Sequence, residues 1–147
     1  MEITFDKIEV GVEYRSAGRT VCEADIVNFA GVTGDFNSLH MDSEWVRANT
    51  PYPTRIAHGL LVHAIGEGLR CKEVDSWKIL AFLETHRRML LPVLPGDRIQ
   101  QNYRVASKKP TSKDTSKGVV EVEVTVTNQK DETVQSGYNR YLIGGAS

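Results

Sequence analysis

The sequence has few of the features that mark secreted, disulfide-stabilised or membrane-embedded proteins. Its only cysteines are Cys22 and Cys71, which form no Cys-x-x-Cys pair and are too few for a disulfide framework. Residues 1–10 alternate apolar and charged side chains and so lack the apolar core of a signal peptide. No segment approaches the roughly 20 consecutive apolar residues of a membrane-spanning helix. These absences predict a soluble, cytoplasmic protein.

An excess of either charge is also missing. The chain has 18 Lys and Arg against 19 Asp and Glu, a formal net charge of -1, so no overall attraction to nucleic acid or to an anionic membrane is expected. Its 147 residues, 40% of them hydrophobic, have the usual size of one compact domain. Because we find neither an internal repeat nor a linker, we predict a single domain over residues 1–147.

The first half of the chain is expected to be mainly helical. Apolar residues recur at the spacing of a buried helical stripe after Ile56, which predicts a long helix over His58–Lys72. Pro51 and Pro53 exclude a helix just before it. The segment Asp35–Asp42 has neither helical nor strand periodicity and is predicted to be a loop. Three earlier or shorter elements are also expected: a strand at 14–21 and helices at 23–30 and 42–48.

The second half of the chain has the pattern of β-strands. Strands are predicted at 77–90, 97–107, 118–128 and 133–143. Their short connections suit antiparallel pairing, which predicts an α+β fold in which a curved antiparallel sheet wraps the long central helix. His63, Glu67 and Arg70 show that part of this helix meets water or a partner, and a dimer is the natural place for that face.

The predicted loop concentrates groups that can bind and move protons. A carboxylate and an imidazole, Asp35 and His40, lie five residues apart. They can converge on one water if the loop folds back on itself. Asn37 and Ser38 favour such folding, because their side chains can hydrogen-bond to nearby backbone. The spacing permits this acid/base pair without establishing it.

Two other catalytic arrangements fit this region poorly. A hydrolase triad of Ser38, His40 and Asp42 is disfavoured, because alternate residues of an extended chain lie about 6.6 Å apart and a nucleophile must lie within about 3.2 Å of its base. A Gly-x-Ser-x-Gly elbow is missing as well. A metal site would draw on His40, Asp42, His58 and His63, but no His-x-x-x-His pair occurs. We therefore predict no metal.

The start of the predicted long helix offers a site for an oxyanion. The first N–H groups of a helix have no partner within it, and the positive end of the helix dipole points the same way. Gly59 lies in this first turn. Because glycine has no side chain, a substrate can approach its backbone closely, and one oxyanion donor is typically worth about 2.7–4 kcal/mol in the transition state.

Four short segments together form a distinctive set: Phe29–Ala30, Gly34–Asp42 (GDFNSLHMD), Ile56–Leu61 (IAHGLL) and Leu91–Asp97 (LPVLPGD). In this order they resemble the MaoC-like, R-specific enoyl-CoA hydratase family. The resemblance spans about residues 21–99, and the later strands agree with the family in type and order but carry no distinctive motif.

The resemblance implies a hot-dog fold and a homodimer, or a dimer of dimers, with active sites near the subunit interface. It also implies that Asp35 and His40 activate a water for syn addition to a 2-enoyl-CoA. Asn37 matches an asparagine that shapes the loop, and Gly59 matches the glycine whose N–H receives the thioester carbonyl. No metal or redox cofactor is implied, and CoA enters only as part of the substrate.

Two positions depart from the family pattern. Ser38 stands where the family usually has proline, which suggests a less rigid loop. Glu67 stands where relatives commonly have a small hydroxyl residue, and an extra carboxylate near the pocket would either repel the charge of Asp35 or indicate different chemistry. His58 is expected to have a supporting, structural role. His63 and Glu67 form an i,i+4 pair that we expect to be solvated or at an interface.

The leading hypothesis is a hydro-lyase of fatty-acyl metabolism. It would hydrate a 2-enoyl thioester of CoA or of an acyl carrier reversibly to the 3-hydroxyacyl thioester. One alternative is an acyl-CoA thioesterase on the same fold, with Glu67 activating water. Another is a non-catalytic acyl-binding subunit of a dehydratase heterodimer. Acyl length, carrier and pathway are not determined by the sequence.

Overall fold

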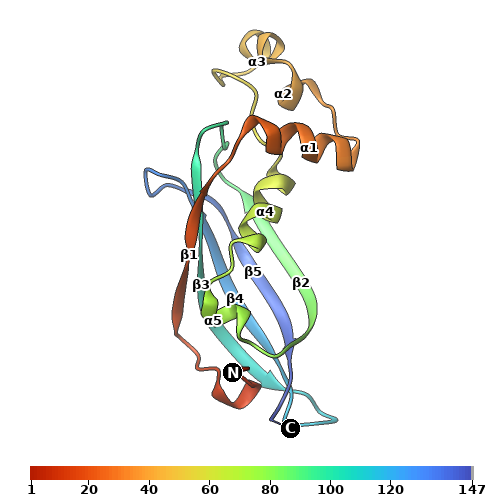
Figure 1. Cartoon of the computed structure of the whole chain (residues 1–147), viewed down its shortest axis with the longest axis vertical. Helices are drawn as coiled ribbons and strands as arrows, with labels where there is room; N and C mark the ends of the chain where they lie inside the picture. Colours follow the sequence, from red (N-terminus) through yellow and green to blue (C-terminus); the bar gives the residue numbers. More distant parts are fainter. Residues whose placement is uncertain (147) are drawn as a thin grey trace.

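The computed structural model describes residues 1–146 and contains a five-stranded antiparallel sheet in the order β1-β3-β4-β5-β2 (Figure 1). The strands are β1 (Glu13–Thr20), β2 (Ile79–Met89), β3 (Arg98–Pro110), β4 (Gly118–Thr127) and β5 (Thr133–Ile143). Every predicted strand is present. The largest boundary error is at β3, which continues to Pro110 and includes residues beyond the predicted end at 107. The α+β class is confirmed.

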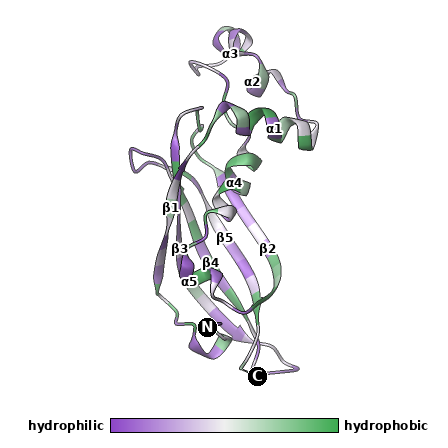
Figure 2. Ribbon diagram, in the orientation of Figure 1, coloured by the Kyte–Doolittle hydropathy of each residue, from purple (hydrophilic) through white to green (hydrophobic). Residues whose placement is uncertain are grey.

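The sheet has an apolar face and a polar face because its strands alternate residue types. In β4, every second residue is a buried valine, whereas Glu121 and Glu123 point to the other face. The valines that are 0–1% exposed are Val120, Val122, Val124 and Val126. Figure 2 shows hydrophilic and hydrophobic residues interleaved along the strands. The buried face is the one that receives the helix.

Helix α4 (Gly59–Gly68) lies against the concave side of the sheet (Figure 1). It begins where expected, but the predicted helix over His58–Lys72 is wrong in length. The chain leaves the helical conformation at Leu69 and resumes as the separate turn α5 (Lys72–Asp75). Gly66 and Gly68 weaken the last turn, because glycine is a poor helix former. A side chain at Gly66 would also collide with Gln101, so this glycine lets α4 sit close to the sheet.

Three helices stand beyond one end of the sheet (Figure 1): α1 (Glu23–Thr33), α2 (Ser38–Met41) and α3 (Ser43–Asn49). Helix α1 ends at Gly34, whose φ of 80° favours glycine. The loop predicted for Asp35–Asp42 is wrong over α2, a single helical turn. Its N-cap is Asn37, whose Oδ1 accepts from the Leu39 N–H at 2.9 Å. One turn is too short to produce a periodic pattern in the sequence.

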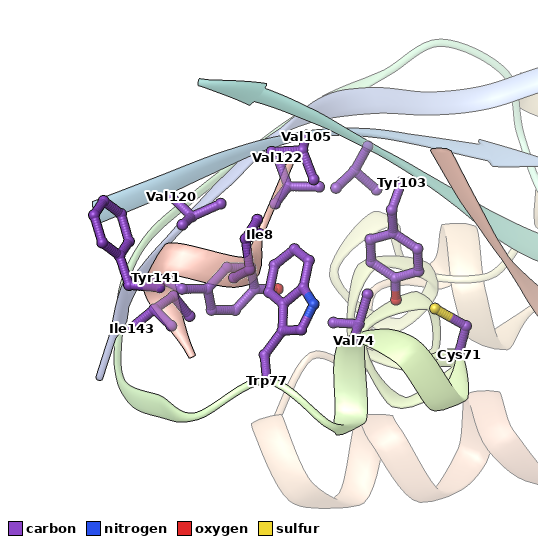
Figure 3. Close-up of a cluster of buried hydrophobic side chains, with 12 residues drawn as sticks. Ile8, Cys71, Val74, Trp77, Tyr103, Val105, Val120, Val122, Tyr141 and Ile143 are labelled. Carbon is purple, nitrogen blue, oxygen red and sulfur yellow. The ribbon is translucent and has the colours of Figure 1, made fainter. Parts of the chain in front are cut away.

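Buried apolar side chains form two clusters near opposite ends of α4. One lies near α5 and is built around Trp77, Tyr103 and Tyr141 (Figure 3). The other packs the start of α4 against α1, and includes Ile26 and Leu61. The elements that carry the candidate site are therefore anchored by a core of their own.

Strand β2 leaves one edge of the sheet unpaired within the described chain, since its only strand partner is β5. Leu80, Phe82, Leu83 and Met89 of this strand are 46–51% exposed. An apolar edge of this kind is suited to pairing with another strand. Within residues 1–146, no helix combines the length and the apolar character needed to cross a membrane.

Candidate active site

A tight turn after α1 presents the carboxylate of Asp35. The Asp35 N–H is 3.2 Å from Oγ1 of Thr33, and its own Oδ1 accepts from the Asn37 N–H at 3.2 Å. These local bonds, together with the left-handed Gly34, reverse the chain between α1 and α2. Asp35 remains exposed, so its carboxylate is available to a ligand.

His40, on α2, is held in one tautomer by the backbone. The residue is 9% exposed, and its Nδ1 lies 2.8 Å from the carbonyl oxygen of Ile56. A carbonyl oxygen only accepts hydrogen bonds, so in the neutral ring Nδ1 carries the hydrogen. The lone pair is then on Nε2. His40 also lines a cavity, and its free nitrogen can accept a hydrogen bond there.

His58, the N-cap of α4, braces both predicted catalytic residues. Its Nε2 is 3.0 Å from the backbone carbonyl of Asp35, and its ring stacks on that of His40 with centroids 3.8 Å apart and an interplanar angle of 26°. Phe29 contacts the same ring edge-on at 5.0 Å. His58 is 3% exposed, and its Nδ1 has no partner in the described chain. The expected supporting role of His58 stays a prediction, with this geometry as its support.

The three side chains converge. A carboxylate oxygen of Asp35 and one ring nitrogen each of His40 and His58 all lie within 4.8 Å of one another. Two hydrogen bonds of about 2.8 Å can span up to about 5.6 Å, so one water can bond to Asp35 and His40 together. The same three groups could be considered for a metal ion. Stacked imidazoles, however, direct their in-plane lone pairs side by side rather than to one point, which fits a shared water better.

Of the four residues considered in the sequence as ligands of a metal, His40 and His58 lie together, whereas His63 and Asp42 have other partners. His63 bonds through Nε2 to Oγ1 of Thr85 at 2.8 Å. Asp42 is the N-cap of α3 and accepts from the Trp45 N–H at 3.0 Å. Ser38 is the first residue of α2 and does not line the cavity. The absence of a metal remains a prediction.

A cavity of about 270 Å³ opens beside His40. Its walls are mainly apolar and come from the 52–62 segment, from the end of β2 and its following loop, and from β5. Gly59 lies in this wall as the first residue of α4, where its N–H has no acceptor within the helix. A Cβ at Gly59 would come 2.9 Å from Cγ of Met89. The missing side chain therefore keeps the N–H approachable.

Sequence reasoning missed Gln135, the one amide side chain that residues 1–146 contribute to this wall. Gln135 is 2% exposed, donates from Nε2 to the Gly59 carbonyl at 2.8 Å, and leaves Oε1 without a partner in the described chain. Its inward position on β5 was available as a signal, because a polar residue interrupts an apolar face there.

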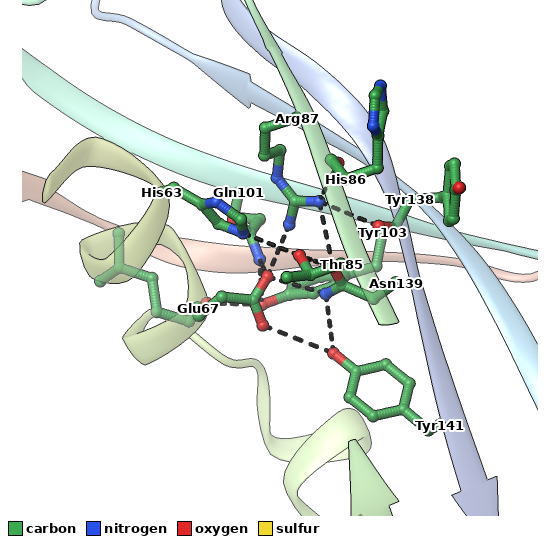
Figure 4. A network of polar contacts seen from close by, with 11 residues as sticks. His63, Glu67, Thr85, His86, Arg87, Gln101, Tyr103, Tyr138, Asn139 and Tyr141 are labelled. Carbon is green, nitrogen blue, oxygen red and sulfur yellow. Dashed lines mark hydrogen bonds and ion pairs between the residues drawn. The ribbon is translucent and has the colours of Figure 1, made fainter. Parts of the chain in front are cut away.

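Glu67 is not part of the cavity wall. It lies at the other end of α4, and its Oε1 is 2.6 Å from Nη2 of Arg87 and 2.7 Å from Nδ2 of Asn139 (Figure 4). Burial lowers the pKa of Arg87, and the Glu67 charge opposes that shift. Burial, with the Glu67 charge adding to it, raises the pKa of Tyr141 to about 12. We expected His63 and Glu67 to form a solvated or interface pair. That expectation did not include Arg87 of β2, with which Glu67 forms an ion pair.

The family of the chain follows from the match of its sequence. A family model described as "MaoC like domain" matches residues 7–128, which include Asp35, His40 and Gly59. The chain belongs to the MaoC-like family. The resemblance inferred from the four sequence segments is therefore confirmed.

This MaoC-like chain is similar in sequence to three named relatives. The 3-hydroxybutyryl-CoA dehydratase of Methylorubrum extorquens is 45% identical over 106 residues, 72% of this chain and 66% of the relative. Protein MaoC of Klebsiella aerogenes is 34% identical over 109 residues, 74% of this chain and 32% of the relative. The (R)-specific enoyl-CoA hydratase of Aeromonas caviae is 30% identical over 100 residues, 68% of this chain and 72% of the relative. The chain thus spans about a third of Protein MaoC and just under two thirds of the dehydratase.

Solved structures confirm the hot-dog fold of the MaoC-like chain. A structure described as a monoamine oxidase regulatory protein from Archaeoglobus fulgius has a TM-score of 0.91 and 33% identity, and the match covers 99% of this chain and 97% of that one. A conserved protein of Mycobacterium tuberculosis with a double hot-dog fold has a TM-score of 0.85 at 19% identity, covering 99% and 45% of the two chains. The second likeness shows the fold alone.

Proposed function

We propose that this MaoC-like chain catalyses the reversible syn addition of water to a 2-enoyl thioester. Membership of the family supports enoyl-CoA hydration in general. The observation that carries the proposal is the approach of the Asp35 carboxylate to the His40 and His58 rings within 4.8 Å, beside an apolar cavity with the Gly59 N–H in its wall.

The proposed reaction uses one water for both added groups. The thioester carbonyl accepts a hydrogen bond from the Gly59 N–H, which stabilises the negative charge that develops as C3 is attacked. One hydrogen of the water bonds to Nε2 of His40 and remains on the oxygen, which becomes the 3-hydroxyl. The other passes to the Asp35 carboxylate as the C3–O bond forms, and Asp35 returns it to C2. Because both groups come from one face, the addition is syn, and no cofactor is needed.

The same proposal includes a second copy of the chain as partner. The unpaired edge of β2 and its exposed Leu80, Phe82 and Leu83 provide an apolar strand suited to pairing with its own copy in a homodimer or a dimer of dimers. The substrate is an acyl-CoA or acyl-carrier thioester. Sedimentation of the purified chain tests the assembly, and a monomer at micromolar concentration would contradict it.

A single assay tests the reaction. Crotonyl-CoA is incubated with the purified chain, while the conjugated enoyl absorbance and free thiol are followed together. Hydration removes the absorbance and releases no thiol, and chiral analysis should find the (R)-3-hydroxyacyl product. Release of thiol would show a thioesterase instead. Binding of acyl-CoA without turnover, until a second protein is added, would show the non-catalytic subunit.

A further inference from the structure

A buried, charged network lies beneath the second half of α4 (Figure 4). At its centre is the Glu67 carboxylate, which is bonded to Arg87 and Asn139. It also accepts a hydrogen bond from Nε2 of Gln101 at 3.3 Å and one from the Tyr141 hydroxyl at 3.5 Å. The Arg87 side chain is 1% exposed and that of Glu67 is 16% exposed. These charges are therefore held inside the fold.

This network lies one step deeper than the cavity, along the same elements. Met89 of β2 and Gln135 of β5 line the cavity and pair in register, and the next inward pair along these strands is Arg87 with Gly137. Two residues of a strand span about 6.6 Å, so Arg87 lies about that far beyond the Met89–Gln135 pair. An acyl chain that enters past Gly59 and runs beneath α4 would meet the network after Gln135.

The network cannot easily be pushed aside. Nη1 of Arg87 donates to the carbonyls of His86 and Tyr138 and to Oδ1 of Asn139, at 2.8–3.2 Å. On the other side, Gly66 holds α4 directly against Gln101, leaving no room for a chain between them. Moving Arg87 or Glu67 would leave a buried charge without its partner. The free energy gained by burying a few methylenes of an acyl chain does not offset that loss.

We infer that the Glu67–Arg87 network closes the deep end of the acyl site and restricts the substrate to short-chain enoyl thioesters. Glu67 and Arg87 are specificity-determining residues that do not touch the reacting atoms. This inference rests on the proposed hydratase function. It also excludes Arg87 as the reader of an acidic acyl tail, because its charge is already balanced by Glu67.

The first test is a chain-length series with the unaltered protein. In an open apolar channel, each added methylene should raise kcat/KM about fourfold. The closed site predicts instead a fall of at least tenfold from the four-carbon to the eight-carbon 2-enoyl-CoA. The dissociation constants of butyryl-, hexanoyl- and octanoyl-CoA, measured by calorimetry, should show no fourfold gain per methylene. A steady gain in either series would overturn the inference while leaving the hydratase function intact, whereas failure to hydrate any enoyl thioester would count against the function.

The second test removes the network as a pair. Replacing both partners, Glu67→Met with Arg87→Met, leaves no unpaired charge and should raise the ratio of eight-carbon to four-carbon kcat/KM at least tenfold. The matched control replaces both members of the exposed Arg104–Glu123 pair by Met. Nη1 of Arg104 and Oε2 of Glu123 lie 3.1 Å apart, and their loss should leave the ratio unchanged. A folded double variant with an unchanged ratio would refute the inference. If the variant does not fold, the series with the unaltered protein decides alone.

A substrate with a charged tail provides a third test. A four-carbon enoyl-CoA bearing a terminal carboxylate should have a kcat/KM at least tenfold below that of crotonyl-CoA. A preference for the charged substrate that disappears in Arg87→Met would overturn the inference and assign Arg87 to substrate binding.

Discussion

The two ends of α4 hold similar chemical groups in opposite states of pairing. At the first turn, the Gly59 N–H, Nε2 of His40 and the exposed Asp35 carboxylate face a cavity or solvent. Two turns later, Glu67 is bonded to Arg87 and Asn139. The Glu67 carboxylate is already occupied by a buried guanidinium, whereas the Asp35 carboxylate is exposed and open to a water or a ligand. Pairing therefore distinguishes the reactive end of the helix from the structural end.

Removing the reactive groups should have the largest effect. Asp35→Asn or His40→Ala should lower kcat on crotonyl-CoA by about 10²–10⁴, because each change removes one of the two acceptors for the water. Steady-state kinetics measure this loss. The matched controls are Asp42→Asn, which keeps an N-cap for α3, and His86→Ala, which removes a ring stacked on Tyr138. If either catalytic variant kept the activity of its control, the assignment of that residue would be lost.

Crowding the same end of α4 should have the next largest effect. In Gly59→Ala the added methyl comes 2.9 Å from Met89 and obstructs approach to the N–H, so kcat should fall by up to about 10²–10³. The fold should survive, because Met89 is flexible. Gly68→Ala is the control, since a Cβ there meets nothing within 4 Å. Equal kcat values for the two variants would show that Gly59 is not an oxyanion donor.

Breaking the Glu67–Arg87 pair should lower the free energy of unfolding and have little effect on kcat. Glu67→Gln leaves Arg87 as a buried cation without its counter-charge, which we expect to lower the free energy of unfolding by about 3 kcal/mol. Urea denaturation measures this. Glu123→Gln removes an exposed partner of Arg104 and should cost less than about 1 kcal/mol. A large loss of kcat in folded Glu67→Gln, with little loss of stability, would contradict the division between the two ends.

The stability of the fold around Glu67 and Arg87 should also depend on pH, through His63. Burial and the charge of Arg87 lower the pKa of His63, with Glu67 opposing them, so the folded protein binds this proton less readily than the unfolded chain. Stability contributed here is present above pH about 6.5, the unfolded pKa, and is lost as the pH falls below it. In His63→Gln this part of the pH dependence of the melting temperature should disappear. An unchanged profile would remove His63 from the account.

The smallest expected effect concerns the departure at Ser38. As the first residue of α2 it occupies a position that proline favours, and Asn37 before it has φ -55° and ψ 140°, which a following proline accepts. Ser38→Pro should therefore raise stability by about 0.4–1 kcal/mol and keep kcat. Calorimetric melting measures the gain. A loss of stability would show that the hydroxyl or N–H of Ser38 has a role in the turn.

Much of the fold follows from local patterns, and the site follows only in part. Every strand was predicted from its composition and its bounding turn residues, with alternation clearest in β4, whose valines are buried on one face. The motif around Asp35 and Gly59 identified the family. The early end of α4 was missed, although Gly66 and Gly68 are poor helix formers and were visible in the sequence. The stacking of His40 on His58 joins residues 18 positions apart by tertiary contact, and no local pattern encodes it.

The pairing of Glu67 escaped prediction for a related reason. The sequence placed Glu67 near His63 on one helix. Its partner lies on a predicted strand that carries two adjacent arginines, Arg87 and Arg88. Strand parity permits one of them, and only the register of β2 against β5 selects Arg87. Inward-facing Gln101 and Asn139 were visible as polar residues in apolar strands, and such interruptions are the signal that could have located the network.

The placement of α1, α2 and α3 beyond the sheet makes the catalytic geometry depend on how this extension is fixed to the start of α4. Three hydrogen bonds contribute: Ile56 N–H to the Leu39 carbonyl, His40 Nδ1 to the Ile56 carbonyl, and His58 Nε2 to the Asp35 carbonyl. Packing of Ile26 of α1 in the same buried cluster as Leu61 of α4 adds to them. A substitution that loosens this cluster should therefore disturb the spacing between the proposed base and the oxyanion donor without touching either of them.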